Sequence, residues 1–222
     1  LASMPPVSDK RLNGYVQSVL QSVAGASARP ELYSGWHAQV VDSDQVNAVS
    51  APGGYVFLTT GLLRELKDEE ELAAVLAHEV AHVADRHGVK TIKASRLSSA
   101  FKLLGSQVAE RYSSKELGQL TDLFGGSVDD VVTAVVVSGY SQDKEFEADR
   151  DGAKFARRAL YDPQALNRFI ERTGSGQGGF LKTHPSPKKR LESLAEDPLE
   201  PVPGYAGASL RKKRFLAAVA RL

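Results

Sequence analysis

Apolar side chains recur at helical spacing close to the start of the chain, between residues 8 and 26. One face of this predicted helix carries Leu12, Val16, Val19, Leu20 and Val23. Two stretches rich in β-branched and aromatic residues follow, at 36–41 and 46–60, and both are typical of strands. Pro52 and two glycines interrupt the second stretch. Because proline has no N–H, we expect this part to lie at a sheet edge or a bulge.

Residues 68–87 carry a strong helical pattern directly after these strands. Asp68 can cap this helix, and Glu71, three residues later, completes a pair similar to a capping box. Three acidic residues in the first turn suit the positive end of the helix dipole. We therefore expect a stable helix at this point.

Helical periodicity returns at 141–160 and 163–173, and a short helix is expected after Pro187. No internal repeat and no clear linker separates these elements. The pattern predicts one predominantly helical α+β domain over residues 1–222. Its small sheet should have an edge strand, within 46–60, that precedes the helix at 68–87.

Composition and charge narrow the function classes. The chain has 222 residues and a formal net charge of +1, which gives no global field for nucleic acid. Cysteine is absent, which excludes disulfide scaffolds, iron–sulfur clusters and cysteine nucleophiles. The tail at 208–222 carries five basic and no acidic residues. This tail is either a solvated helix face or a weak site for peripheral membrane or envelope association.

Two of the five histidines form a motif within the helix at 68–87, in the order His78-Glu79-Val80-Ala81-His82. Four residues make about one helical turn, so both imidazoles project from one face. That spacing suits two nitrogen ligands to zinc, and Glu79 lies close enough to act on a water that the metal holds. Small and apolar residues surround the motif, so the helix should be buried and its polar groups need a function.

A third ligand is expected from the helix at 141–160. Glu145 and Asp149 lie on a face with small residues, whereas Glu147 shares a charged face that is typical of solvent exposure. We therefore favour Glu145 as the ligand and Asp149 as the residue that holds a ligand histidine, and Glu147 remains the alternative ligand. The metzincin pattern would need a histidine where Gly88 stands, so it fails. We interpret His87 as a capping or surface residue.

Three protein ligands leave zinc an open position, which is typical of catalysis rather than of a structural site. A single catalytic Zn²⁺ with Glu79 as general base suits hydrolysis of peptide bonds. The sequence also resembles a zinc metallopeptidase family, that of the CAAX prenyl protease, HtpX, and the BepA-type and Oma-type proteases. The segments that carry the resemblance are VNAVSAPGGYVFLTTGLL (46–63), DEEELAAVLAHEVAHV (68–83), EFEAD (145–149) and THPSPKKRL (183–191).

The resemblance implies a zincin-like, gluzincin-like core over about 46–191, with His78, His82 and Glu145 as ligands and Glu79 as base. It further implies an edge strand that binds the substrate backbone. The residues that we expect to contact substrate there are Asn47, Gly54, Tyr55 and Val56. By the same resemblance, His184 is a candidate catalytic residue that stabilises the oxyanion or gates the metal.

The predicted function is a zinc metalloendopeptidase that acts on extended or misfolded protein substrates in protein quality control. The alternative is a metal-binding, chaperone-like or interaction module with little hydrolysis. Because no apolar run is long enough to span a membrane, we expect a relative of the exported members, in the bacterial cell envelope or periplasm, with the cytoplasm as the alternative. The poorly periodic segment 105–128 could cover the site. Nucleic acid is not expected as a partner, and the sequence does not fix the oligomeric state.

Overall fold

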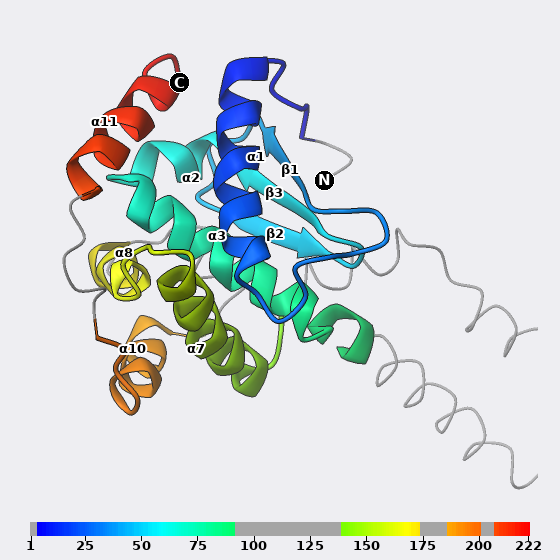
Figure 1. Cartoon of the computed structure of the whole chain (residues 1–222), viewed down its shortest axis with the longest axis vertical. Coiled ribbons are helices and arrows are strands. Elements are labelled where there is room, and N and C mark those ends of the chain that lie inside the picture. The colour runs from blue at the N-terminus through cyan, green and yellow to red at the C-terminus, as the bar shows by residue number, and fades with distance from the viewer. Residues whose placement is uncertain (1–3, 92–138, 174–185, 201–206) are drawn as a thin grey trace, which may run out of the picture.

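Three short strands form one sheet in the part of the chain that the computed structural model describes, which comprises residues 4–91, 139–173, 186–200 and 207–222. The strands are β1 (His37–Val41), β2 (Ala48–Ala51) and β3 (Tyr55–Thr59). The remaining elements are helices: α1 (Lys10–Gly25), α2 (Thr60–Glu65), α3 (Glu69–Ala84), α7 (Gln142–Arg158), α8 (Ala165–Thr173), α10 (Pro187–Ala195) and α11 (Ala208–Val219). The prediction of a mainly helical α+β fold with a small sheet is confirmed (Figure 1).

The strand order is β1-β3-β2, with β1 parallel and β2 antiparallel to β3. The sheet edge expected within 46–60 is formed by β2, and β3, the strand that comes directly before the helices, is central. Its backbone pairs on both sides, because β1 returns beside it as a parallel neighbour. The edge that lies nearest to α3 belongs to β2 instead.

The outer edge of β1 is closed by other parts of the chain. Asn13 and Gln17 of α1 accept hydrogen bonds from the backbone N–H groups of Val40 (2.9 Å) and Ala38 (2.6 Å). The segment before α1 adds a bridge between Pro6 and Val41. Side chains of α1 thus satisfy strand donors that would otherwise face water. Among the described residues, β2 is left as the edge without a strand neighbour.

Helix α3 passes through the middle of the molecule, between α1, the sheet and α7 (Figure 1). Its apolar and small side chains are almost all buried, and they join the inward faces of α1 and β3 in one core. Gly152 of α7 allows the closest approach. A methyl group added there would lie 2.9 Å from the backbone nitrogen of His78. The two helices can therefore lie almost backbone to backbone at the level of the motif.

The first turn of α3 is acidic, and it is also buried. Glu69, Glu70 and Glu71 are at most 4% exposed. Asp68 caps the turn as predicted, accepting from the N–H of Glu71 at 3.0 Å. Arginines of two other helices neutralise the three carboxylates, since a buried charge is costly unless it is paired.

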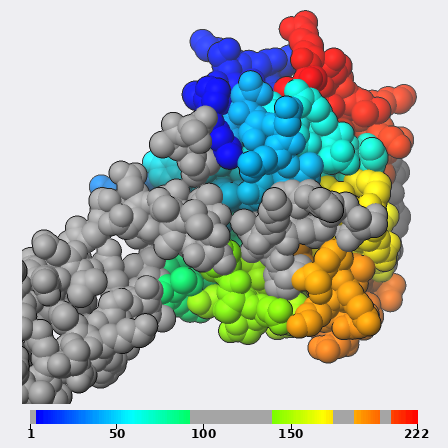
Figure 2. Space-filling view, turned by 180° about the vertical axis from the view of Figure 1, so that it is seen from behind, coloured from blue at the N-terminus to red at the C-terminus, as the bar shows by residue number. Residues whose placement is uncertain are grey.

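These arginines come from α8 and α11. Arg172 of α8 donates two hydrogen bonds to Glu71, at 2.6 and 2.7 Å. Arg214 of α11 pairs with Glu69, and Arg211 of the same helix lies 3.2 Å from Glu70. Two of the five basic residues of the tail therefore pair with buried carboxylates. Figure 2 shows α11 against the end of the molecule opposite to α10. No helix in the described ranges is long and apolar enough to cross a membrane.

Candidate metal centre

Helices α3 and α7 bring two histidines and a glutamate together in the core. His78 and His82 lie one turn apart on α3, and their Nε2 atoms are 3.1 Å from each other. Glu145 of α7 faces both nitrogens. Its Oε2 lies 3.6 Å from His78 Nε2, and its Oε1 lies 3.6 Å from His82 Nε2. The donor atoms all lie within 4.8 Å of one another, and none of the three side chains is more than 1% exposed. Nitrogen and carboxylate donors in this arrangement can hold a divalent cation.

His78 is held from behind by a buried ion pair. Its Nδ1 lies 2.8 Å from Asp149, which also accepts from Nε and Nη2 of Arg190 at 2.8 and 2.6 Å. Burial alone would raise the pKa of Asp149, but Arg190 and His78 hold that pKa well below its usual range. Asp149 is thus ionised and accepts the Nδ1 proton of His78. Its Nε2 faces Glu145, and the carboxylates of Asp149 and Glu145 raise the pKa of His78 despite its burial.

The second histidine has a different support. His82 Nδ1 lies 3.0 Å from Nδ1 of His87, and His87 Nε2 lies 3.1 Å from Glu147. Burial lowers the pKa of His87 more than the hydrogen bond with Glu147 raises it, so this ring is neutral. A carboxylate can only accept, so the proton of His87 resides on Nε2 and its Nδ1 accepts from His82. The Nε2 atom of His82 is then unprotonated and faces the cluster.

The interpretation of His87 as a capping or surface residue was wrong. Its side chain is fully buried, and it links a motif histidine to α7. Helix α3 ends at Ala84, and a further helical turn begins at residue 87, which turns the His87 ring back towards the cluster. Glu147, the alternative ligand, is about half exposed and contacts His87 rather than the cluster. No spacing rule in the sequence connects these two residues.

Glu79 and Tyr140 complete the surroundings of the cluster. Glu79 is 2% exposed, and its Oε1 has no hydrogen-bond partner among the described residues. Tyr140 stacks on His82, with ring centroids 4.1 Å apart, and burial together with the charges of Glu79 and Glu145 raises its pKa. The phenol therefore keeps its proton at neutral pH. Sequence reasoning gave no signal for Tyr140, which precedes α7.

The predicted substrate residues are spread over the β2–β3 hairpin. Asn47 is buried, and its backbone pairs with Thr59. Gly54 has φ = +95°, and a methyl group there would lie 2.4 Å from the carbonyl oxygen of Gly35, so it serves the turn. Tyr55 stacks on His37, and Val56 is fully buried in the core. None of these four residues lines the small hollow described below, which His82 does line. His184 and the segment 105–128 lie outside the described residues.

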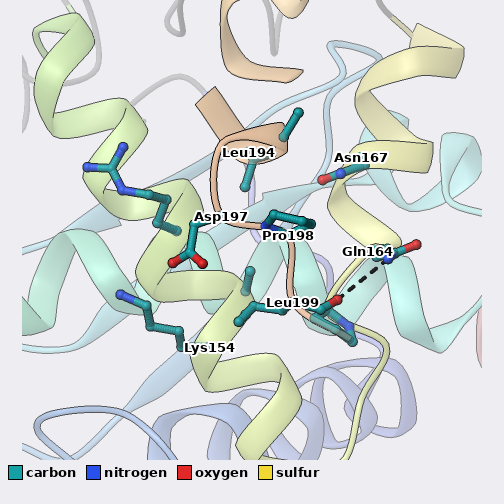
Figure 3. A pocket seen from close by; sticks show the side chains of 11 residues that line it. Lys154, Gln164, Asn167, Leu194, Asp197, Pro198 and Leu199 are labelled. Atoms are coloured by element: carbon teal, nitrogen blue, oxygen red, sulfur yellow. Dashed lines mark hydrogen bonds between the residues drawn. The ribbon is translucent and has the colours of Figure 1, made fainter. Parts of the chain in front are cut away.

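The hollows on the surface of the described residues include two that differ in their position relative to the cluster. The larger, of about 340 Å³, lies between α7, α8 and the segment after α10, and none of the cluster residues lines it. In Figure 3, Asp197 and Lys154 lie on one side of it, and Gln164 and Asn167 on the other. The smaller, of about 230 Å³, is lined by His82, Tyr140, the end of β2 and the residues after α3. Only this second hollow adjoins the cluster.

The family model and relatives that match this chain are described as peptidases or proteases. The family model described as Peptidase family M48 matches residues 10–197. The mitochondrial metalloendopeptidase OMA1 of Schizosaccharomyces pombe is 33% identical over 188 residues, which cover 82% of this chain and 52% of that protein. The beta-barrel assembly-enhancing protease of Escherichia coli (strain K12) is 30% identical over 200 residues, which cover 85% of this chain and 39% of that protein.

A plant relative extends the comparison. The mitochondrial metalloendopeptidase OMA1 of Arabidopsis thaliana is 31% identical over 165 residues, which cover 72% of this chain and 31% of that protein. The chain thus spans about half or less of the length of these relatives. The family match includes α3 and α7, which carry the cluster. Since it covers most of the sequence, the chain belongs to peptidase family M48.

Proposed function

We propose that this protein is a zinc-dependent endopeptidase that hydrolyses peptide bonds of extended or misfolded protein segments. The observation that carries the proposal is the buried cluster of His78, His82 and Glu145. Beside it on the same helix, a carboxylate oxygen of Glu79 has no hydrogen-bond partner among the described residues. Family membership and the names of the relatives, which are metalloendopeptidases and proteases, support the reaction class.

The donor set fits zinc. Two imidazole nitrogens and one carboxylate are common zinc ligands, and they leave a position open for catalysis. The two Nε2 atoms lie 3.1 Å apart and both face Glu145, so a single cation could contact all three side chains. Zinc bound there would act as a Lewis acid that activates water and polarises the scissile carbonyl. Asp149 and His87 would keep the two histidines in the tautomer that this requires.

Glu79 is the general base in this proposal. Its carboxylate takes a proton from the attacking water and passes it to the nitrogen of the leaving amine. Burial without a hydrogen-bond partner leaves one of its oxygens available for that proton. Tyr140 lies near Glu79, and its raised pKa keeps its hydroxyl protonated, so this hydroxyl can donate a hydrogen bond.

The outer edge of β2 is the surface that we propose for the substrate backbone. An extended peptide can add to an unpaired strand edge through main-chain hydrogen bonds. The edge of β1 is closed by α1, and β3 is paired on both sides, so β2 replaces 55–59 in this role. A peptide bound in this way must be extended, which favours unfolded segments over compact domains.

The substrate class and location rest on the relatives. The name of the Escherichia coli protein links a similar chain to beta-barrel assembly. We propose a role in protein quality control in the bacterial cell envelope or periplasm, where substrates with exposed strands would be cleaved. A spheroplast fractionation of the native host would test the location.

Substitution of the base tests the mechanism. Glu79→Gln should keep the metal and lose cleavage of a denatured casein-like substrate by about 10³-fold or more, because the proton acceptor is gone. Metal content by mass spectrometry and turnover should be measured on the same preparation. Undiminished turnover in this variant would overturn the proposal and would leave a metal-binding module without Glu-assisted hydrolysis.

A matched pair of variants tests the ligand set. Glu145→Gln should reduce bound zinc strongly, whereas Glu147→Gln should reduce it much less, since Glu147 acts only through His87. Loss of the metal in the Glu147 variant alone would contradict the assignment.

A further inference from the structure

We propose that the smaller hollow is a subsite that selects a carboxylate of the substrate next to the cleaved bond, and that Arg29, Arg86 and Ser50 determine this preference. The inference rests on the proposed peptidase function and goes beyond it by naming a substrate feature. A carboxylate could come from an aspartate or glutamate side chain or from the end of a peptide chain. Both share the chemistry that the subsite would recognise.

The position of the hollow ties it to the reaction. His82, which contributes to the cluster, also forms part of its wall, as does Tyr140, which stacks on His82. Ser50 and Ala51, at the end of β2, form another part. A peptide bound along the β2 edge would therefore place one side chain in the hollow. That side chain would lie next to the peptide bond that faces the cluster.

The charge of the hollow has one sign. Apart from His82, the titratable side chains among its described lining residues are Arg29, Arg86 and the phenol of Tyr140, and no aspartate or glutamate is among them. Neither guanidinium forms a hydrogen bond or an ion pair within the described part of the chain. Two unpaired guanidinium groups on one small hollow favour an anion, and the planar guanidinium matches a carboxylate with two parallel hydrogen bonds.

The backbone conformation of Arg86 accompanies the position of its side chain on the hollow. Arg86 follows the end of α3 with φ = +58°, in the left-handed region where glycine is the usual residue. Here the conformation coincides with the placement of a guanidinium on the wall of the hollow.

Ser50 adds a neutral donor. Its residue is 3% exposed, and its Oγ is buried and has no hydrogen-bond partner in the described structure. A buried hydroxyl without a partner is costly, and a substrate oxygen would satisfy it. The remaining wall includes Leu32, Pro52 and Val89, which can contact the methylene groups of an acidic side chain.

Peptide cleavage tests the subsite. A set of internally quenched peptides with amidated ends should carry Glu, Gln or Lys at one position at a time around the cleaved bond. At one position, the zinc-loaded enzyme should cleave the Glu peptide about tenfold more efficiently in kcat/KM than the Gln peptide, as expected for one charge-assisted pair. A second set with free chain ends and no internal acid separates the two sources of the carboxylate.

Variants identify the residues. Arg29→Gln and Arg86→Gln should each reduce the preference for Glu over Gln, and the double change to Glu should favour the Lys peptide. Ser50→Ala should reduce the preference without reversing it. Arg11→Gln, an exposed arginine at the start of α1, is the matched control and should keep the preference.

The outcomes separate the two proposals. Equal cleavage of Glu, Gln and Lys peptides, and of free and amidated ends, would overturn the subsite and leave the peptidase intact. If no peptide is cleaved by the zinc-loaded chain, the peptidase proposal fails. The subsite is then judged by fluorescence anisotropy of the same labelled peptides on Glu79→Gln protein, where tighter binding of the Glu peptide supports it and equal binding refutes it.

Discussion

The two histidines of the motif have their ring protons fixed by different partners. A carboxylate held by Arg190 accepts from His78, whereas His82 donates to a neutral histidine that in turn donates to Glu147. In both cases the nitrogen that faces the cluster is Nε2. The orientation of the two histidines therefore depends on side chains outside the cluster.

The first prediction concerns His87. His87→Phe should lower the affinity for zinc by about 10- to 100-fold, because His82 loses the acceptor that fixes its proton on Nδ1. Competition with a chromophoric chelator measures this change. His37→Phe, at a histidine that stacks on Tyr55 on the surface, is the control. Equal affinities of the two variants would show that His87 does not position His82.

A second prediction concerns Asp85, which caps the end of α3. Burial and the charges of Asp151 and Glu147 raise its pKa from 3.8 to about 6. The folded protein therefore keeps this proton up to about pH 6, whereas the unfolded chain releases it near pH 3.8. Stability falls as the pH rises between these values, and the loss is complete at neutral pH.

Asp85→Asn should remove this cost. We expect the variant to be more stable than the wild type by about 1 kcal/mol at pH 7.5, since the side chain is only half-buried, and equal to it below about pH 3. Urea unfolding at the two pH values measures the difference. A gain that is the same at both would exclude an electrostatic cause.

At the residue scale, the sequence predicted which acidic side chains of the helix at 141–160 face inward, and the reason is physical. Helical periodicity separates an inward from an outward face, and it placed Glu145 and Asp149, both fully buried, apart from the half-exposed Glu147. Periodicity ends where the helix ends. His87 lies beyond the last residue of α3, so its direction depends on the left-handed turn at Arg86, which no spacing rule predicts.

Among the elements, α3 and α7 set the geometry of the cluster through their close approach. Each contributes one part of the donor set, so a change in their separation moves Glu145 relative to the motif. Gly152 lies at the point of contact, opposite the backbone of His78.

Gly152→Ala tests this approach. The added methyl group should force the helices apart, destabilise the protein by about 1–3 kcal/mol and weaken zinc binding. Gly14→Ala in α1 is the matched control, because nothing lies within 4 Å of its added methyl group. It should stabilise the protein by about 0.5–1 kcal/mol. Chemical unfolding of both variants should give opposite signs, and a shared sign would refute the packing argument.

The elements show why strand order was harder to predict than strand position. The β-branched stretches at 36–41 and 46–60 do contain the three strands, because local composition reports extended backbone. The neighbour of each strand depends on pairing between residues far apart in sequence. The parallel pairing of β1 with β3 is of this kind. It makes β3 the central strand and leaves β2 at an edge.

For the whole molecule, the cluster links metal binding to stability. Residues of α3 and α7 come together only in the folded chain, so a metal that binds there favours the folded state. Zinc at 100 times its dissociation constant should add about 2.7 kcal/mol, or roughly 5–10 °C in Tm for a chain of this size. Thermal unfolding with zinc and with chelator measures the shift. His78→Ala should lose it, and a full shift in that variant would place the metal elsewhere.

The basic tail shows how a charge pattern gains its meaning only from the whole fold. From the sequence, five basic residues at 208–222 were compatible with solvent or with a membrane surface. In the structure, Arg211 and Arg214 neutralise buried glutamates, and Phe215 between α11 and the core is 1% exposed. The acidic first turn of α3 is the partner, but nothing local in either segment identifies the other.

This pairing has a consequence for biosynthesis. Glu69 and Arg214 are 145 residues apart, so on the ribosome the helix that carries the motif emerges long before the arginine that neutralises its first turn. Until Arg214 is present, burial of the first turn of α3 leaves the carboxylate of Glu69 without a counter-charge. Burial is then unfavourable, because an unpaired buried charge is costly. Glu69 in the first turn of α3 therefore gains its counter-charge only once α11 has been made.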